Sequence, residues 1–161
     1  MMVDLPQLIQ MIIKIFLALV IGITLGLNRW LHHKSAGIRT HSLVAVGSAL
    51  LMLLIESYDG VDSQAISRVI QGLITGIGFL GAGVIMHAEG ARKVHGLTTA
   101  ASIWICAILG VVVGSGRYEL ALIAMGSILL VLVIGGFLEK ITGRILGVDR
   151  SSEVPGDDST S

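Results

Sequence analysis

VIQGLITGIGFLGAGVIM, residues 69–86, gives the clearest indication of how this chain folds. Its eighteen residues carry no charged side chain, yet five of them are glycines: Gly72, Gly76, Gly78, Gly81 and Gly83. In water, five glycines would cost a helix about 4 to 5 kcal/mol relative to alanine, at about 1 kcal/mol each. In lipid no water competes for the backbone N–H and C=O groups, so the helix forms, and small residues let neighbouring helices approach closely. The stretch therefore predicts a transmembrane helix whose glycines serve helix packing.

The rest of the chain repeats this pattern. Further uncharged runs cover residues 15–27, 42–55, 96–116 and 120–138. Hydrophobic residues make up 53% of the chain and charged residues 14%, whereas charged residues make up about a quarter of a soluble domain. We therefore expect an all-α, polytopic membrane protein with about five transmembrane helices in one domain, residues 1–145. The polar, acidic end of the chain, residues 146–161, predicts a disordered tail.

The second run, residues 42–55, is too short to span a membrane by itself. Its fourteen residues extend about 21 Å, against a hydrocarbon core of about 30 Å. It either spans the membrane with polar ends or turns back within it. The distribution of Lys and Arg residues between the two sides of the membrane distinguishes these two topologies. If all five runs span, eight of the eleven basic residues lie on one side, whereas a re-entrant second run leaves five on each side. The positive-inside bias favours five spans, with the N-terminus outside and the C-terminus in the cytoplasm.

The first run reaches spanning length only by extending back toward Leu8, which takes in Lys14. Two interpretations of Lys14 stay open. Its ammonium snorkels to the nearer interface, or it is a functional charge within the membrane.

Three glycines imitate a nucleotide-binding motif. Gly76, Gly78 and Gly81 match G-x-G-x-x-G, but that motif needs a preceding strand and an acidic residue about 20 positions later, where this chain has Gly96. We predict no cofactor here and interpret the glycines as packing residues. Small-xxx-small pairs elsewhere support helix packing, at Gly22 and Gly26 and at Gly110 and Gly114.

The polar residues that border the membrane runs fall into two clusters. Arg39, Thr40 and His41 precede the second run, and Thr98 and Thr99 lie at the start of the fourth. Under the five-span topology both clusters lie on the cytoplasmic side. We expect them to form one polar layer at the cytoplasmic edge, with Arg39 as its fixed charge.

An anchoring role is the alternative for these residues. Juxtamembrane Arg and Lys residues commonly bind lipid phosphates, and a Thr in a span commonly donates to its own helix. We favour the anchor for Arg29 and Lys34 and leave Arg39 open between the two roles.

Metal binding and catalysis have little support. Mg²⁺ prefers oxygen ligands, usually with one or two carboxylates, and none of the five runs contains Asp or Glu. Glu56, Asp59 and Asp62 lie in an outer loop, where they attract cations or simply keep the loop solvated. His41 and His95 have no acidic neighbour in sequence that would support a general base. We predict no catalytic residue, no metal site and no nucleic-acid partner.

Four blocks of the chain resemble the signatures of the MgtC/SapB family. They are GIRTH at residues 37–41, GIGFLGAGVI at 76–85, GLTTAASIW at 96–104 and GSGRY at 114–118, in the family's order and spacing. The resemblance implies a bacterial inner-membrane protein with about five spans. It links the chain to growth in low magnesium, to survival inside macrophages and, through the best-known member, to restraint of the F1Fo ATP synthase.

The chain departs from the family pattern in two places. Where the family usually shows Gly-x-Glu-Arg-Glu after the first span, residues 26–30 read GLNRW, so no role of those carboxylates is carried over. Longer members also have a soluble domain after the last span, and we expect none here because the chain ends about 20 residues beyond that span.

These observations favour a non-enzymatic membrane protein that acts through helix packing. Its expected partners are the lipid bilayer, other copies of the chain and a membrane complex such as the ATP synthase. A magnesium or other ion transporter is the alternative.

Overall fold

The computed structural model describes residues 4–58, 60–87 and 94–145. Within these residues lie the helices α1 (Leu5–Leu31), α2 (Ile38–Glu56), α3 (Ser63–Val84), α4 (Leu97–Gly114) and α5 (Tyr118–Ile145). The strands β1 (Met86–His87) and β2 (Val94–His95) form a short antiparallel hairpin with Met86 opposite His95. All five helices are long and apolar enough to cross a membrane, which confirms the predicted all-α polytopic fold. The predicted tail, residues 146–161, lies outside the described residues.

The second helix is longer than its uncharged run. α2 has 19 residues and extends about 28 Å, because it begins at Ile38 and takes Arg39, Thr40 and His41 into its first turn. The predicted spanning role of residues 42–55 thus agrees with the length of α2. Its polar N-terminal turn supplies the missing length.

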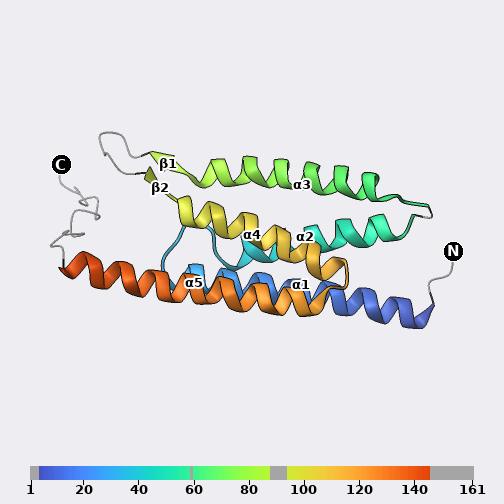
Figure 1. Cartoon of the computed structure of the whole chain (residues 1–161), viewed down its shortest axis with the longest axis horizontal. Helices are drawn as coiled ribbons and strands as arrows, with labels where there is room; N and C mark the ends of the chain where they lie inside the picture. The colour runs from blue at the N-terminus through green and yellow to red at the C-terminus, as the bar shows by residue number, and fades with distance from the viewer. Residues whose placement is uncertain (1–3, 59, 88–93, 146–161) are drawn as a thin grey trace, which may run out of the picture. The chain divides into compact units, whose positions relative to one another are not determined.

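The chain divides after Met125 into two units, and α5 continues from the first into the second. In the first unit α2 contacts both α1 and α4, and α4 also contacts α1 and α3. Figure 1 shows these four helices side by side. α2 and α4 are about half buried, whereas α3 is largely exposed. It contacts mainly α4, and its N-terminal half also packs against Met52 and Ile55 of α2.

Glycines bring α1, α2 and α4 into close contact. A Cβ at Gly22 or Gly26 would run into the backbone of α2, at Ser42 and Ile38 respectively. A Cβ at Gly110 or Gly114 would meet α2 further along, at Ala45 and Ala49 respectively. Both small-xxx-small pairs outside residues 69–86 therefore lie at backbone contacts between helices.

The glycines of residues 69–86 behave differently. Gly81 faces Ala100, 3.5 Å from where its Cβ would be. The other four have no described neighbour within 4 Å of that position: Gly72, Gly76, Gly78 and Gly83. Within the described chain only Gly81 of this set lies at a helix contact.

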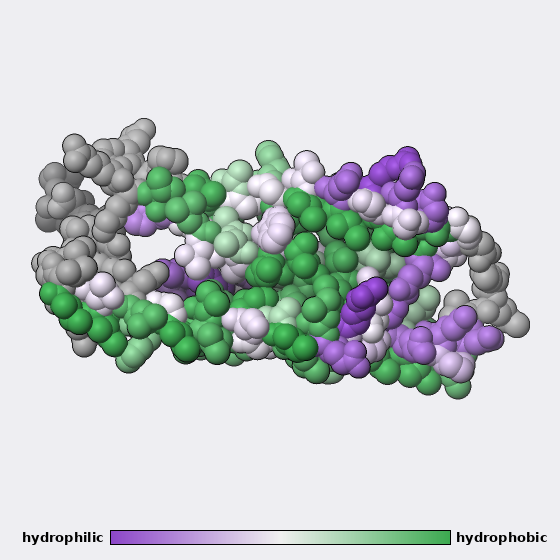
Figure 2. Space-filling model, in the orientation of Figure 1, coloured by the Kyte–Doolittle hydropathy of each residue, from purple (hydrophilic) through white to green (hydrophobic). Residues whose placement is uncertain are grey.

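Much of the surface is apolar, as a lipid-facing protein requires. Figure 2 shows hydrophobic residues over much of the visible face, with hydrophilic residues gathered at the end where α2 ends and α3 begins. Phe79, on the outer side of α3, is 84% exposed. Such contiguous apolar surface is rare on soluble monomers and fits contact with lipid chains.

Lys14 is buried in α1, and its Nζ lies 2.6 Å from Oε2 of Glu56 at the end of α2. The ammonium is therefore paired within the protein. This pair links α1 to α2 at one end of the bundle, as the glycines do along its length.

A buried polar cluster as the candidate functional site

Arg29 is the most deeply buried charge that the structure describes. It lies in the last turn of α1 and is only 5% exposed. Its Nη2 donates a hydrogen bond of 2.7 Å to Oγ1 of Thr99, in the first turn of α4. Its Nε is fully enclosed and has no hydrogen-bond partner among the described residues. The position near the C-terminus of α1 favours a cation, because the last carbonyls of a helix carry partial negative charge.

His41 completes the cluster from α2 and is fully buried. Its Nδ1 lies 2.9 Å from the carbonyl oxygen of Gly37, and its Nε2 lies 3.0 Å from Oγ of Ser102. A carbonyl only accepts, so the neutral ring donates from Nδ1 and accepts at Nε2 from the Ser102 hydroxyl.

The Ser102 hydroxyl has two acceptors within reach. It lies 2.8 Å from the carbonyl oxygen of Thr99 as well as 3.0 Å from the imidazole of His41. Its single proton serves one acceptor at a time when the ring is neutral. We call Arg29, His41, Thr99 and Ser102 the buried polar cluster, which joins α1, α2 and α4 at one end of the bundle.

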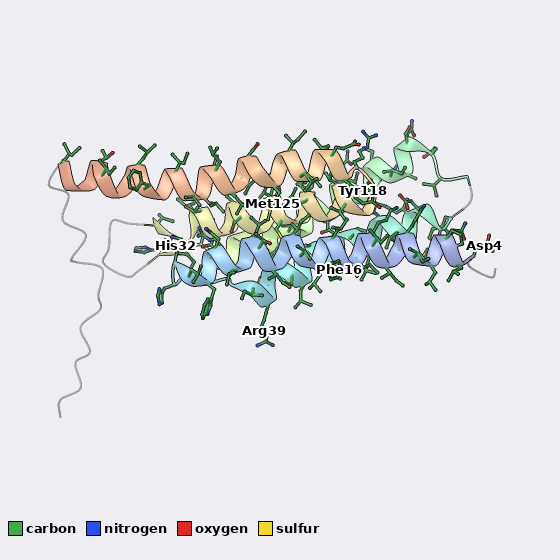
Figure 3. The ribbon with its side chains drawn as sticks, turned by 90° about the horizontal axis from the view of Figure 1, so that it is seen from below. Asp4, Phe16, His32, Arg39, Tyr118 and Met125 are labelled. Atoms are coloured by element: carbon green, nitrogen blue, oxygen red, sulfur yellow. The ribbon has the colours of Figure 1, made fainter. Side chains whose placement is uncertain are left out.

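Two of the predicted polar-layer residues belong to this cluster. Thr99 and His41 are buried in it, whereas Thr98 and Arg39 are exposed and Thr40 is partly exposed. Figure 3 shows the Arg39 side chain pointing away from the helices. The predicted layer is therefore divided between the interior and the surface.

Sequence reasoning did not select Arg29 and Ser102, although helical spacing could have found them. Arg29 follows Gly26 by three residues and Gly22 by seven, so it lies on the same face of α1 as these buried glycines. Ser102 follows Thr99 by three residues on the buried face of α4. Thr98 is displaced from that face by one residue, or about 100° around the helix.

The cluster is not a metal site as it stands, because Arg29 is a cation that only donates hydrogen bonds. Among the described residues there is no group of three or more His, Cys, Asp or Glu side chains that could hold a metal ion. Cys106 is buried beside the cluster, and its Sγ donates to the carbonyl oxygen of His41 at 3.3 Å. The hydrogen bonds of the cluster link α1, α2 and α4 around one buried charge.

Five helices long and apolar enough to cross a bilayer define a multi-pass membrane protein. A model of the MgtC family matches residues 15–141, and the chain belongs to this family. Protein SrpB of Synechococcus elongatus is 41% identical over 150 residues, which cover 87% of this chain and 80% of that protein. These findings confirm the family resemblance that the four sequence blocks indicated.

Two further relatives are longer than this chain. The putative magnesium transporter YhiD of Escherichia coli is 38% identical over 144 residues, which cover 85% of this chain and 64% of YhiD. Protein MgtC of Salmonella typhimurium is 36% identical over 142 residues, which cover 88% of this chain and 58% of MgtC. No solved structure gives a significant match.

Proposed function

We propose that this chain is a non-enzymatic regulator in a bacterial inner membrane and that it binds a membrane partner through the open face of α3. The observation that carries the proposal is the contrast among its glycines. Gly72, Gly76 and Gly83 have no described neighbour, whereas the glycine pairs of α1 and α4 lie against helix backbones. Small residues left open on a membrane helix allow another helix to approach closely.

The open face of α3 is continuous along the helix. Gly72, Gly76, Phe79 and Gly83 are spaced by four, three and four residues, which places them on one side of α3. This side is opposite Ile77 and Gly81, the buried residues of the helix. Phe79 projects between glycines, so a large apolar side chain is flanked by small residues that allow a partner helix to approach closely.

Regulation through such a surface needs a difference between the partner's states. A protein that binds one state of its partner more tightly shifts the population toward that state. The F1Fo ATP synthase is the partner that the family resemblance suggests. The proposal includes a cytoplasmic C-terminus, in line with the positive-inside bias. It also includes self-association, which the same open face would support.

YhiD is named as a putative magnesium transporter, and this relative motivates the second candidate, an ion transporter. The buried charges on the described helices argue against a cation path through the bundle. Arg29 is a buried cation, and buried Lys14 already neutralises Glu56. A divalent cation passing Arg29 would be repelled without a carboxylate to compensate.

The test is ATP-driven proton pumping in inverted bacterial membrane vesicles with and without the chain. We expect reduced pumping with the chain and restored pumping with Gly76→Leu at equal protein level. Gly47→Leu is the matched control, because Gly47 of α2 is also exposed and also has no described neighbour within 4 Å. Unchanged pumping, or equal effects of the two variants, would overturn the proposal. Magnesium flux in proteoliposomes would then test the transporter.

A further inference from the structure

A cavity of about 670 Å³ lies where α2 ends, α3 begins and α4 turns into α5, away from the buried polar cluster. Its volume falls within the range of about 300 to 1,000 Å³ that is typical of small-molecule sites. The whole cavity belongs to the first unit of the chain. Its walls combine two opposite charges with apolar side chains.

The cationic wall is held by the turn between α4 and α5. Gly116 has a φ of +73°, and its N–H donates to the Val113 carbonyl at 2.9 Å. The N–H of Arg117 donates to the Val112 carbonyl at 3.1 Å, so the turn is a Schellman motif. The turn fixes the backbone of Arg117 at the cavity. The Arg117 guanidinium has no hydrogen bond or ion pair with any described residue.

The anionic wall is Glu56, in the last turn of α2. The Lys14 ammonium of α1 forms an ion pair with Oε2 of Glu56, yet the Glu56 side chain remains 45% exposed. The carboxylate is thus oriented by one cation and accessible to another. Glu56 and Arg117 present one negative and one positive charge to the same space.

Apolar side chains form much of the remaining wall, beside the hydroxyl groups of Tyr58 and Ser115. Met52 and Ile55 of α2 and Ile66 and Ile70 of α3 line the cavity, and all four belong to one hydrophobic cluster. This arrangement, with charges at the helix ends and apolar side chains along the helices, matches the change from the interface to the hydrocarbon region of a bilayer.

We propose that this cavity binds a phospholipid with a primary-amine headgroup, phosphatidylethanolamine. The lipid phosphodiester accepts hydrogen bonds from the Arg117 guanidinium, and the ammonium group donates to the Glu56 carboxylate. The first part of an acyl chain lies against Ile66 and Ile70. The proposal does not depend on the proposed regulatory function.

The two charges select among headgroups. Guanidinium groups bind phosphate oxygens through paired N–H donors, so Arg117 can bind the phosphate of every phospholipid. A primary ammonium donates hydrogen bonds to a carboxylate, but a trimethylammonium group has no N–H to give. Phosphatidylglycerol brings no cation for Glu56. Of these three headgroups, ethanolamine therefore complements both walls.

The experiment compares lipids on the delipidated chain in detergent. Phosphatidylethanolamine, phosphatidylcholine and phosphatidylglycerol with identical acyl chains are added separately, and retained lipid is quantified by native mass spectrometry. We expect about tenfold preferential retention of phosphatidylethanolamine, as one charge-assisted hydrogen bond would give. Equal retention of the three lipids would overturn the proposal.

Variants locate the binding. Arg117→Gln should reduce retention of all three lipids about tenfold, and it leaves the Lys14–Glu56 pair intact. Glu56→Gln should abolish the preference for ethanolamine over choline. Arg39→Gln is the matched control, since it removes an exposed Arg that does not line the cavity. Equal retention by Arg117→Gln and Arg39→Gln would contradict the assignment.

A separate arm tests the source of the phosphate. Water-soluble phosphoethanolamine is added to the delipidated chain as a competitor of the intact lipid. We expect weak competition, because the soluble compound lacks the acyl chain that would contact the apolar wall. Competition at concentrations equal to those of the lipid would show a site for a soluble phosphate ester and would overturn the lipid assignment.

Discussion

Replacing Thr99 by Val tests whether the buried polar cluster stabilises the helix bundle. Val has nearly the shape of Thr and the same branching at Cβ, so packing and helix propensity change little. The change removes Oγ1, which accepts from Nη2 of Arg29 at 2.7 Å. Nε of Arg29 already lacks a partner among the described residues, so the guanidinium would lose a bond that Nε cannot replace.

The magnitude follows from comparing two classes of hydrogen bond. Hydrogen bonds between membrane helices contribute about 0.6 kcal/mol on average and about 1.7 kcal/mol at the upper end. Bonds to charged groups in proteins contribute about 1.5 to 3 kcal/mol. Because Arg29 is charged and 5% exposed, we expect the upper end of the membrane range, about 1.5 kcal/mol, or about tenfold in the unfolding equilibrium.

Thr98→Val is the matched control, because Thr98 is the adjacent residue of α4 and is exposed. The assay is reversible unfolding in mixed micelles, followed by tryptophan fluorescence. We expect a change below about 0.5 kcal/mol for the control. Equal destabilisation by the two substitutions would refute the assigned role of Thr99.

A double-mutant cycle adds a second criterion. Arg29→Met removes the charge, and afterwards Thr99→Val should cost little, because there is no guanidinium left to satisfy. We expect a coupling of about 1 kcal/mol between the two sites. Strictly additive costs would show that the 2.7 Å bond does not contribute to stability.

Four further outcomes are expected. Gly110→Ala should destabilise the bundle by about 2 kcal/mol in the same assay, because its Cβ would meet the α2 backbone, whereas Gly47→Ala should be neutral or slightly stabilising. Lys14→Met should lower the free energy of unfolding by only about 1 kcal/mol, because the Glu56 carboxylate left behind is 45% exposed and is solvated, and adding Glu56→Gln should change stability little further. Arg39→Ala removes an exposed guanidinium that is available to a partner beside α3, so it should weaken regulation of pumping while membrane insertion, measured by fractionation, stays intact. Mass determination in detergent should find a dimer or larger assembly, and a strict monomer would count against self-association.

Most of the fold could be predicted because the bilayer imposes one rule on every span. An uncharged run of sufficient length must be helical in lipid, whatever it contacts. The helix ends were harder to predict, since a helix continues into polar sequence wherever its backbone is satisfied. α1 includes Arg29 at one end, and α2 includes Arg39 in its first turn. Runs defined by the absence of charge therefore underestimate both helices.

The candidate site could be predicted only in part. Thr99 and His41 were selected because they border the membrane runs, and the structure places both in the buried polar cluster. Arg29 was assigned to lipid phosphates, because the bond that buries it joins residues 70 positions apart. Local sequence contains the spacing of Arg29 relative to Gly22 and Gly26 but not the presence of α4 opposite that face.

The glycines of α1 and those of α3 show how the residues on a glycine-rich helix face affect function. Gly22 and Gly26 lie on the face of α1 that also carries Arg29, so close helix approach encloses a charge that must then be satisfied internally. The open face of α3 carries Phe79 between glycines, without a charge on the stretch from Gly72 to Gly83. A surface of this kind needs no internal polar partner and can face lipid or another helix at equal electrostatic cost. Shape complementarity rather than charge would therefore decide what binds α3.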